Sequence, residues 1–279
     1  LSAVQPVVTQ LAHEEDGEPY RVWKLECGGG RYILKEAKEY EAEVYRAVLP
    51  KAGGSVPSLY QTADIDGKTY LLMEFVEGSD LRKCSRCGLT LALDALIRMQ
   101  RATWNDRALS GCAYTFEKSL SDREHRGKYL NDSALEEAYA GFLDEYKSVP
   151  RVLCHDDLLP FNVIVSDDRA VLIDWEFAGI LPYPASLARL IAHGEEDVNA
   201  FFYMTRADRE FSVEYYYDNL LREMGIPYEQ WLRTLDYFLL YEYCEWVFLG
   251  NKYGEVNEGY YRKYLALAKQ QADKLLHMN

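Results

Sequence analysis

Apolar and polar residues alternate in five short segments near the start of the chain. Such alternation is typical of half-buried strands, because successive side chains of a strand point to opposite faces. The predicted strands are residues 7–11, 20–27, 31–37, 59–62 and 69–75. Gly28-Gly29-Gly30 and Asp66-Gly67 fall between neighbouring strands, and glycine accepts the positive φ angles of tight hairpin turns. We therefore expect an antiparallel sheet in this part of the chain.

One helix interrupts these strands. Residues 39–49 have helical periodicity, and Pro50 and the glycines after it end the pattern. The apolar stripe consists of Val44, Tyr45 and Val48. Counting back by three and four places Glu41 on the same inward face, whereas Glu43 points elsewhere. Because a carboxylate on a buried face needs a partner, Glu41 is expected to have one.

After residue 78 the pattern changes to that of helices. Apolar residues recur every three to four positions in residues 89–104, 133–146, 213–224, 229–249 and 257–277. A strand pair, 163–165 and 171–174, interrupts them. The chain thus divides into a strand-rich front part and a helical back part, with the boundary expected between residues 74 and 79.

Composition restricts the partners. The 279 residues, 48% of them hydrophobic, suffice for one large domain or two lobes that share a cleft. The formal net charge of −14 argues against nucleic acid or an anionic membrane surface as a partner, since both usually need a basic patch. It favours a cationic or neutral partner, although acidity also serves solubility alone.

Cysteine spacing and apolar runs indicate the compartment. The cysteines at 27, 84, 87, 112, 154 and 244 lack the dense spacing of a secreted disulfide scaffold. Cys84 and Cys87 form a CxxC that has no second ligand pair at zinc-site spacing. Neither a run of about 18 apolar residues nor a secretory leader occurs. A cytoplasmic protein with free thiols and no membrane partner is expected.

The residues that suggest chemistry follow a short apolar strand. This strand delivers His155 and Asp157, a turn that contains proline delivers Asn162, and a hairpin brings Asp174 back beside them. Mg²⁺ prefers hard oxygen ligands together with substrate phosphates, so Asn162 and Asp174 suit it. Phosphoryl transfer also needs a group that accepts the proton of the incoming hydroxyl, and Asp157 is placed for that role.

This segment resembles the aminoglycoside phosphotransferase and choline kinase superfamily, the small-molecule relatives of protein kinases. The resemblance rests on HxDxxxxN between apolar strands, followed at hairpin distance by IDWEFAG, and it covers about residues 6–195. It implies an α+β, two-lobed, protein-kinase-like fold. The N-lobe, residues 1–76, would bind the nucleotide, and the mainly helical C-lobe, residues 77–279, would contain the catalytic loop.

The resemblance also implies roles for single residues. ATP and Mg²⁺ would be the cofactors, Asp157 the catalytic base, Asn162 and Asp174 the metal ligands, and His155 a support of the catalytic loop. Within the catalytic machinery we therefore count Asp157 and His155.

Residues upstream agree with this family. Lys35 ends its strand at the position where such kinases place the lysine that contacts the ATP phosphates. Glu41, which faces inward by periodicity, would be its ion-pair partner, and Glu39 and Glu43 are the alternatives. The run 71–76 resembles the hinge strand against which adenine lies. The residues expected there are Glu74, Phe75 and Val76.

Two features depart from the family pattern. The loop expected to cover the phosphates, residues 14–19, has one glycine and four acids, and anionic side chains beside phosphates cost energy. Asp156 stands where the family usually has glycine or asparagine. A second carboxylate beside Asp157 would either raise the pKa of Asp157 or face solvent, and we expect it to face solvent.

In this family the C-terminal helices build the acceptor pocket. Glu242, Glu245 and Trp246 lie on or near one face of the segment 229–249, where they could hold an amine by charge and cation–π contact. More commonly, such a face is a core aromatic stripe with an exposed acidic edge. The expected reaction is ATP- and Mg²⁺-dependent phosphorylation of a hydroxyl on a small molecule, including amine-bearing ones.

Other nucleotide-binding and hydrolytic classes lack their motifs. The chain has no Walker loop, no GxGxxG and no GxSxG. Two alternatives remain open: a non-catalytic nucleotide-binding module, which the acidic loop favours, and a protein-directed kinase similar to the spore-coat relatives.

Overall fold

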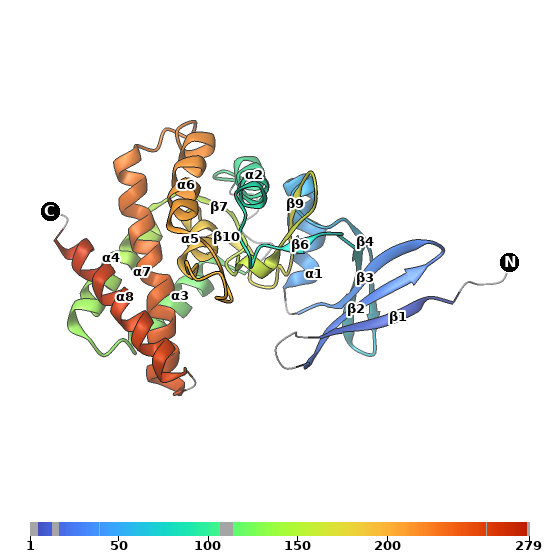
Figure 1. Cartoon of the computed structure of the whole chain (residues 1–279), viewed down its shortest axis with the longest axis horizontal. Helices are drawn as coiled ribbons and strands as arrows, with labels where there is room; N and C mark the ends of the chain where they lie inside the picture. The colour runs from blue at the N-terminus through green and yellow to red at the C-terminus, as the bar shows by residue number, and fades with distance from the viewer. Residues whose placement is uncertain (1–4, 13–16, 39, 107–113, 255, 278–279) are drawn as a thin grey trace.

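An antiparallel sheet forms one end of the molecule and a group of helices forms the other (Figure 1). The computed structural model describes residues 5–12, 17–38, 40–106, 114–254 and 256–277. The sheet has the strand order β1-β2-β3-β5-β4. Its strands are β1 (Val7–Ala12), β2 (Pro19–Cys27), β3 (Gly30–Glu36), β4 (Leu59–Ile65) and β5 (Lys68–Glu74). The predicted α+β architecture is confirmed, and each of the five predicted strands is present.

The hairpin between β2 and β3 shows why glycine is needed there. Cys27 pairs with Gly30, so Gly28 and Gly29 alone make the turn. Their φ angles are 59° and 80°, a left-handed pair typical of a two-residue hairpin turn. The turn fixes the register of β3, in which Lys35 pairs with Val22 on one side and with Leu71 of β5 on the other.

The helix predicted over residues 39–49 differs in form. It begins as α1 (Glu41–Glu43), continues as the π-helical turn η1 (Val44–Val48) and then tightens into η2 (Leu49–Ser55). The predicted end at Pro50 was wrong, because proline fits the first turn of a new helical stretch, where its missing N–H costs nothing. The inward face was correct: Glu41 is fully buried and Glu43 is exposed.

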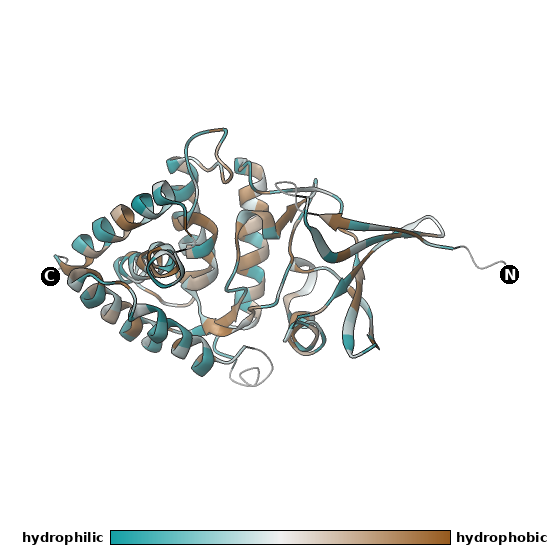
Figure 2. Cartoon of the chain, turned by 90° about the horizontal axis from the view of Figure 1, so that it is seen from below, coloured by the Kyte–Doolittle hydropathy of each residue, from teal (hydrophilic) through white to brown (hydrophobic). Residues whose placement is uncertain are grey.

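The helical part contains elements that periodicity did not reveal. It comprises α2 (Arg86–Ala102), α3 (Phe116–Gly127), α4 (Ser133–Ser148), α5 (Pro184–Ala192), α6 (Arg206–Tyr216), η5 (Tyr217–Leu221), α7 (Tyr228–Tyr253) and α8 (Glu258–Leu276). Helices α3 and α5 were missed. The helix predicted from residue 213 begins at Arg206, because Thr205 and Asp208 form a capping box. Figure 2 shows hydrophilic residues along the outer sides of the C-terminal helices.

Short strands connect the two parts. The strands are β6 (Ser79–Asp80), β7 (Arg151–Cys154), β8 (Val163–Val165), β9 (Ala170–Leu172) and β10 (Gly179–Pro182). A short 3-10 helix, η4 (Pro160–Asn162), directly precedes β8. The predicted boundary between lobes falls between β5 and β6 and stays a prediction. Among the described residues, no helix is long and apolar enough to cross a membrane.

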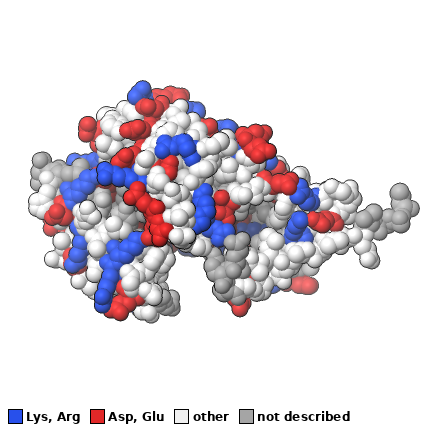
Figure 3. Space-filling model, viewed as in Figure 1, with Lys and Arg blue, Asp and Glu red and all other residues white. Residues whose placement is uncertain are grey.

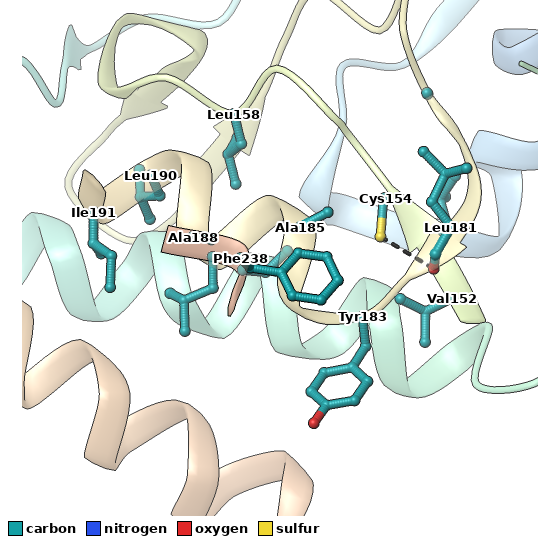
Figure 4. Packing of buried hydrophobic residues seen from close by; sticks show 14 of the residues in the cluster. Val152, Cys154, Leu158, Leu181, Tyr183, Ala185, Ala188, Leu190, Ile191 and Phe238 are labelled. Carbon is teal, nitrogen blue, oxygen red and sulfur yellow. Dashed lines mark hydrogen bonds between the residues drawn. The ribbon is translucent and has the colours of Figure 1, made fainter. Parts of the chain in front are cut away.

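A packed layer supports the loop that follows β7. Figure 4 shows Val152 and Cys154 beside Leu181 and Ala185, which come from β10 and α5. The Cys154 thiol donates to the Leu181 carbonyl at 3.4 Å, and burial raises the pKa of this thiol to about 12. The five described cysteines are all free thiols. The chain that leaves β7 at His155 therefore starts from a rigid base.

Candidate active site

Lys35 joins the sheet to the helical part of the molecule. Its ammonium, Nζ, lies 2.5 Å from Glu41 Oε1 and 2.6 Å from Asp174 Oδ1. Burial alone would lower the pKa of Lys35, but the charges of Asp174 and Glu41 outweigh it and raise this pKa. The predicted ion pair of Lys35 with Glu41 is present; the alternative Glu43 is exposed, and Glu39 lies outside the described residues. We call Lys35, Glu41 and Asp174 the lysine cluster.

His155 contacts the two segments of the predicted catalytic motif, and its role as a support of that loop stays a prediction. Its Nε2 lies 2.6 Å from the carbonyl of Ile173, the residue before Asp174, and its ring packs against Trp175 with centroids 4.6 Å apart. Its backbone N–H donates to Ser186 Oγ at 3.0 Å. Burial lowers the pKa of His155 to about 4. A neutral ring whose Nε2–H donates to a carbonyl positions both halves of the motif, so His155 acts on the loop geometry.

Asp157 makes contact with a residue that the sequence reading did not identify. Arg189 of α5 donates from Nε and Nη2 to Asp157 Oδ1, at 3.1 and 2.9 Å. Burial raises the pKa of Asp157 to about 6; Arg189 opposes this shift, while Glu245 and Asp174 add to it. A carboxylate with a pKa near neutrality is well matched to general-base catalysis.

Asn162 and Asp174 present oxygen atoms that could hold a divalent cation. Asn162 Nδ2 donates to the carbonyl of Asp157 at 2.8 Å, and no hydrogen bond among the described residues reaches its Oδ1. Asp174 has a φ of 64°, and its Oδ1 accepts from Lys35. Burial would raise the pKa of Asp174, yet Lys35 lowers it, so this carboxylate is ionised. One amide oxygen and one ionised carboxylate fit Mg²⁺ that also binds substrate phosphates.

The predicted hinge residues lie at the end of β5, an interior strand of the sheet. Glu74 Oε2 accepts from the backbone and hydroxyl of Ser58 at 3.1 and 3.2 Å, and Oε1 accepts from Arg169 of the β8–β9 turn. The Phe75 ring lies under Arg31, whose guanidinium carbon is 4.9 Å from the ring centroid. Val76 is half-buried. The side chains of Glu74 and Phe75 are thus engaged with protein, which is consistent with the prediction that adenine meets backbone groups here; nucleotide binding itself stays a prediction.

The expectation that Asp156 faces solvent was wrong. Its carboxylate lies 2.7 Å from Arg123 of α3, and both side chains are nearly buried. Arg123 is stacked between the rings of Tyr146 and Tyr241, each with its centroid 4.7 Å from the guanidinium carbon. Asp156 has a φ of 58°, which aspartate tolerates better than most residues. The missed helix α3 supplied the partner that made burial of Asp156 possible.

Glu242 and Glu245 are already engaged in ion pairs. Arg189 Nη1 lies 2.9 Å from Glu242 Oε2 and 2.5 Å from Glu245 Oε2. Arg126 of α3 lies 2.7 Å from Glu245 Oε1. Trp246 stacks on Tyr264 of α8, with ring centroids 5.6 Å apart. We call the following residues the arginine cluster: Arg123, Arg126, Arg189, Asp156, Asp157, Glu242 and Glu245.

The sequence contained one signal for Arg189. Ser186, Arg189 and His193 stand three and four residues apart in an otherwise apolar stretch, so they form a polar stripe on one face of α5. The helix was not predicted, because a nine-residue helix that is apolar on most sides shows little alternation between apolar and polar positions. Arg123 and Arg126 lie on α3, in a part of the sequence for which no helix was predicted.

The loop of residues 14–19 is described only in part. Residues 14–16, which are three of the four acids of this loop, lie outside the described residues. Figure 3 shows acidic and basic side chains interspersed over the helical half.

The fold and this site define a kinase-like phosphotransferase. Residues 8–220 match the phosphotransferase enzyme family, and this chain belongs to that family. The predicted family and the predicted enzyme class, a phosphotransferase, are confirmed.

The chain is also similar to a curated protein in sequence and to solved structures in fold. Protein LicA of Haemophilus influenzae is 27% identical over 152 residues, which are 51% of this chain and 55% of that protein. The chain thus spans about half the length of the curated relatives it matches. The structure of choline kinase LicA from Streptococcus pneumoniae superposes with a TM-score of 0.62 at 17% identity, over 98% of this chain and 95% of that one. Amicoumacin kinase hAmiN gives 0.64 at 18% identity, over 98% and 90%.

Proposed function

We propose that this protein transfers the γ-phosphoryl group of ATP, in a Mg²⁺-dependent reaction, to a hydroxyl of a small molecule. The observation that carries the proposal is the meeting of Lys35 with Asp174 across the two parts of the molecule, close to Asp157. The amicoumacin kinase structure contains AMP-PNP and Ca²⁺, which supports the use of a nucleotide and a divalent cation by a protein of this fold.

On the donor side, Lys35 would contact the ATP phosphates while Glu41 holds it in place. Asn162 and Asp174 would hold Mg²⁺, which would supply positive charge to neutralise the phosphates. Backbone groups of residues 74–76 would receive adenine, with the Glu74 side chain held away by Ser58 and Arg169.

On the acceptor side, Asp157 would remove the proton. The acceptor oxygen forms its bond to the γ-phosphorus, the bond from that phosphorus to the bridging oxygen of ADP breaks, and the hydroxyl proton passes to Asp157. His155 keeps the loop in register by its contact with the Ile173 carbonyl. Catalysis would be mainly positioning and charge neutralisation.

The acceptor is proposed to include amine-bearing hydroxyl compounds. The arginine cluster has four carboxylates, Asp157 included, and three arginines, so its formal charge is −1 when all of them are ionised. A choline kinase and an amicoumacin kinase are among the proteins with this fold. Because Glu242 and Glu245 are already paired, a cationic group would meet the surplus charge of the cluster and not an isolated glutamate pair.

Two measurements test the proposal. Thermal unfolding with ATP, with and without Mg²⁺, should show metal-dependent stabilisation. ADP release should then be screened across choline, other amino alcohols, sugars and aminoglycosides. Turnover with one acceptor class supports the proposal. Binding with no turnover indicates a nucleotide-binding module, and turnover only with a protein acceptor indicates a protein-directed kinase.

A further inference from the structure

Arg189 links the proposed base to a different helix. Its Nε and Nη2 atoms both donate to Asp157 Oδ1, at 3.1 and 2.9 Å. Its Nη1 donates to Glu242 Oε2 at 2.9 Å and to Glu245 Oε2 at 2.5 Å. One guanidinium on α5 therefore connects the catalytic loop to α7.

Both bonds to Asp157 end on the same oxygen. No hydrogen bond among the described residues reaches Oδ2, and 26% of the Asp157 side chain is exposed. A carboxylate held at one oxygen by two donors of a rigid, planar group has little freedom to rotate. The other oxygen, Oδ2, is then the one left to accept a proton.

Arg189 is itself held firmly. Its side chain is 14% exposed, and that of Glu242 only 5%. Glu242 also lies 3.3 Å from His193, whose Nδ1 is 2.8 Å from the Tyr264 hydroxyl. A glutamate this deeply enclosed is poorly placed to touch an acceptor, but it is well placed to fix the guanidinium.

We propose that Arg189 is a positioning residue for phosphoryl transfer, which holds Asp157 Oδ1 so that Oδ2 receives the hydroxyl proton. Glu242 and Glu245 act in this arrangement by holding Arg189. The inference rests on the proposed function and assigns these two glutamates a role other than direct binding of an amine.

The role predicts a characteristic kinetic pattern. Arg189→Gln removes the fork and should lower kcat by roughly a hundredfold, because misplacing a reacting group by about 1 Å has an effect of that size. The KM for ATP should stay unchanged, since the donor-side contacts remain. Arg189→Lys should recover only part of the rate, because an ammonium is a point charge without the planar fork.

Glu242→Gln separates the two possible roles of the glutamates. If Glu242 holds Arg189, this isosteric change lowers kcat, by less than Arg189→Gln does, and leaves the acceptor KM unchanged. If Glu242 binds the acceptor directly, the acceptor KM rises and kcat is kept, which would overturn this part of the inference. The matched control is Arg86→Gln, which breaks the partly buried pair with Asp208, 2.8 Å apart; this pair joins α2 to α6 and includes no residue of the arginine cluster.

The experiment measures ADP release with the best acceptor of the screen, for the wild type, Arg189→Gln, Arg189→Lys, Glu242→Gln, Asp157→Asn and Arg86→Gln. Each variant is first checked for folding by its thermal transition, and Glu242→Gln serves if Arg189→Gln does not fold. Wild-type kcat in Arg189→Gln beside an inactive Asp157→Asn overturns the inference and leaves the proposed function standing. A wild type that turns over no acceptor removes the proposed function, and the inference with it.

Discussion

The lysine cluster and the arginine cluster hold buried charge in different ways. In the first, one ammonium serves two carboxylates, Glu41 and Asp174. In the second, the guanidinium of Arg189 binds three carboxylates at once, and Arg123 and Arg126 bind others. Lysine is a compact charge on a flexible stem, whereas arginine is a rigid planar fork.

The difference corresponds to what each side of the reaction requires. In the proposed reaction, nucleotide and metal would enter and leave on the donor side, where a lysine can exchange a carboxylate for a phosphate without losing its charge. The proposed catalytic side chains would have to stay in one geometry on the acceptor side, where several arginine forks contact them. On the donor side the ligand would supply part of the charge that Lys35 neutralises, whereas on the acceptor side most charge partners are protein side chains.

The largest effect on kcat is expected from a substitution of Asp157. Asp157→Asn retains the size of the side chain and an oxygen for Arg189, but it cannot take the hydroxyl proton. We expect kcat to fall about a thousandfold or more, while stabilisation by Mg²⁺ and ATP is retained. ADP release and thermal unfolding measure the two properties, and full turnover in the variant would show that Asp157 is not the base.

A substitution of Lys35 tests how much the lysine cluster contributes to stability. Lys35→Met leaves Glu41 buried without a charged partner, so the free energy of unfolding should fall by about 3–5 kcal/mol. Adding Glu41→Gln removes the stranded charge and should restore most of the stability but not the turnover. Urea unfolding of the wild type, the single variant and the double variant measures this. A single variant as stable as the wild type would mean that the pair contributes little.

The difference between the two clusters also explains which of their residues could be predicted from the sequence. Lys35, Glu41, Asp157, Asn162 and Asp174 could be proposed from the sequence because each lies in a local pattern: a strand end, a helix stripe or a loop with fixed spacing. Local patterns depend on the period of one element, which a single sequence displays. The fold followed for the same reason.

The arginine cluster was missed because it is assembled from distant elements. Arg123 and Asp156 are 33 residues apart, and Arg189 and Glu245 are 56 apart, so only the packing of helices brings them together. The Glu242 and Glu245 pattern was visible, but its arginine partners were not. From the sequence we therefore considered an amine site and an exposed acidic edge, but not a buried ion pair. A charged residue in a sequence does not show whether the protein already neutralises it.

A third test concerns the support beneath both clusters. The pKa of His155 is about 4 in the folded protein against 6.5 for a free side chain. Between these values the unfolded chain binds a proton that the folded protein does not, so stability is lost as the pH falls from 6.5 to 4 and no further below. Relative to His155→Gln, the wild type should lose about 3 kcal/mol between pH 7 and pH 4.

Urea unfolding of both proteins across this range gives the difference directly. Asp157 titrates in the opposite sense, since its pKa is raised by burial, but it is present in both proteins and cancels. A difference between the two proteins that stays constant with pH would mean that His155 is not buried in its neutral form.

The smallest effect is expected at the predicted hinge, where Arg169 and Glu74 form another ion pair between the two parts of the molecule. Arg169 binds Glu74, but the side chains are 38% and 21% exposed, and Glu74 keeps its bonds to Ser58 when Arg169 is lost. Arg169→Gln should therefore lower the free energy of unfolding by only about 0.2–1 kcal/mol and leave kcat unchanged. Urea unfolding and ADP release, run beside Lys35→Met, measure both. A loss as large as that of Lys35→Met would mean that the hinge pair, and not burial around Lys35, holds the two parts together.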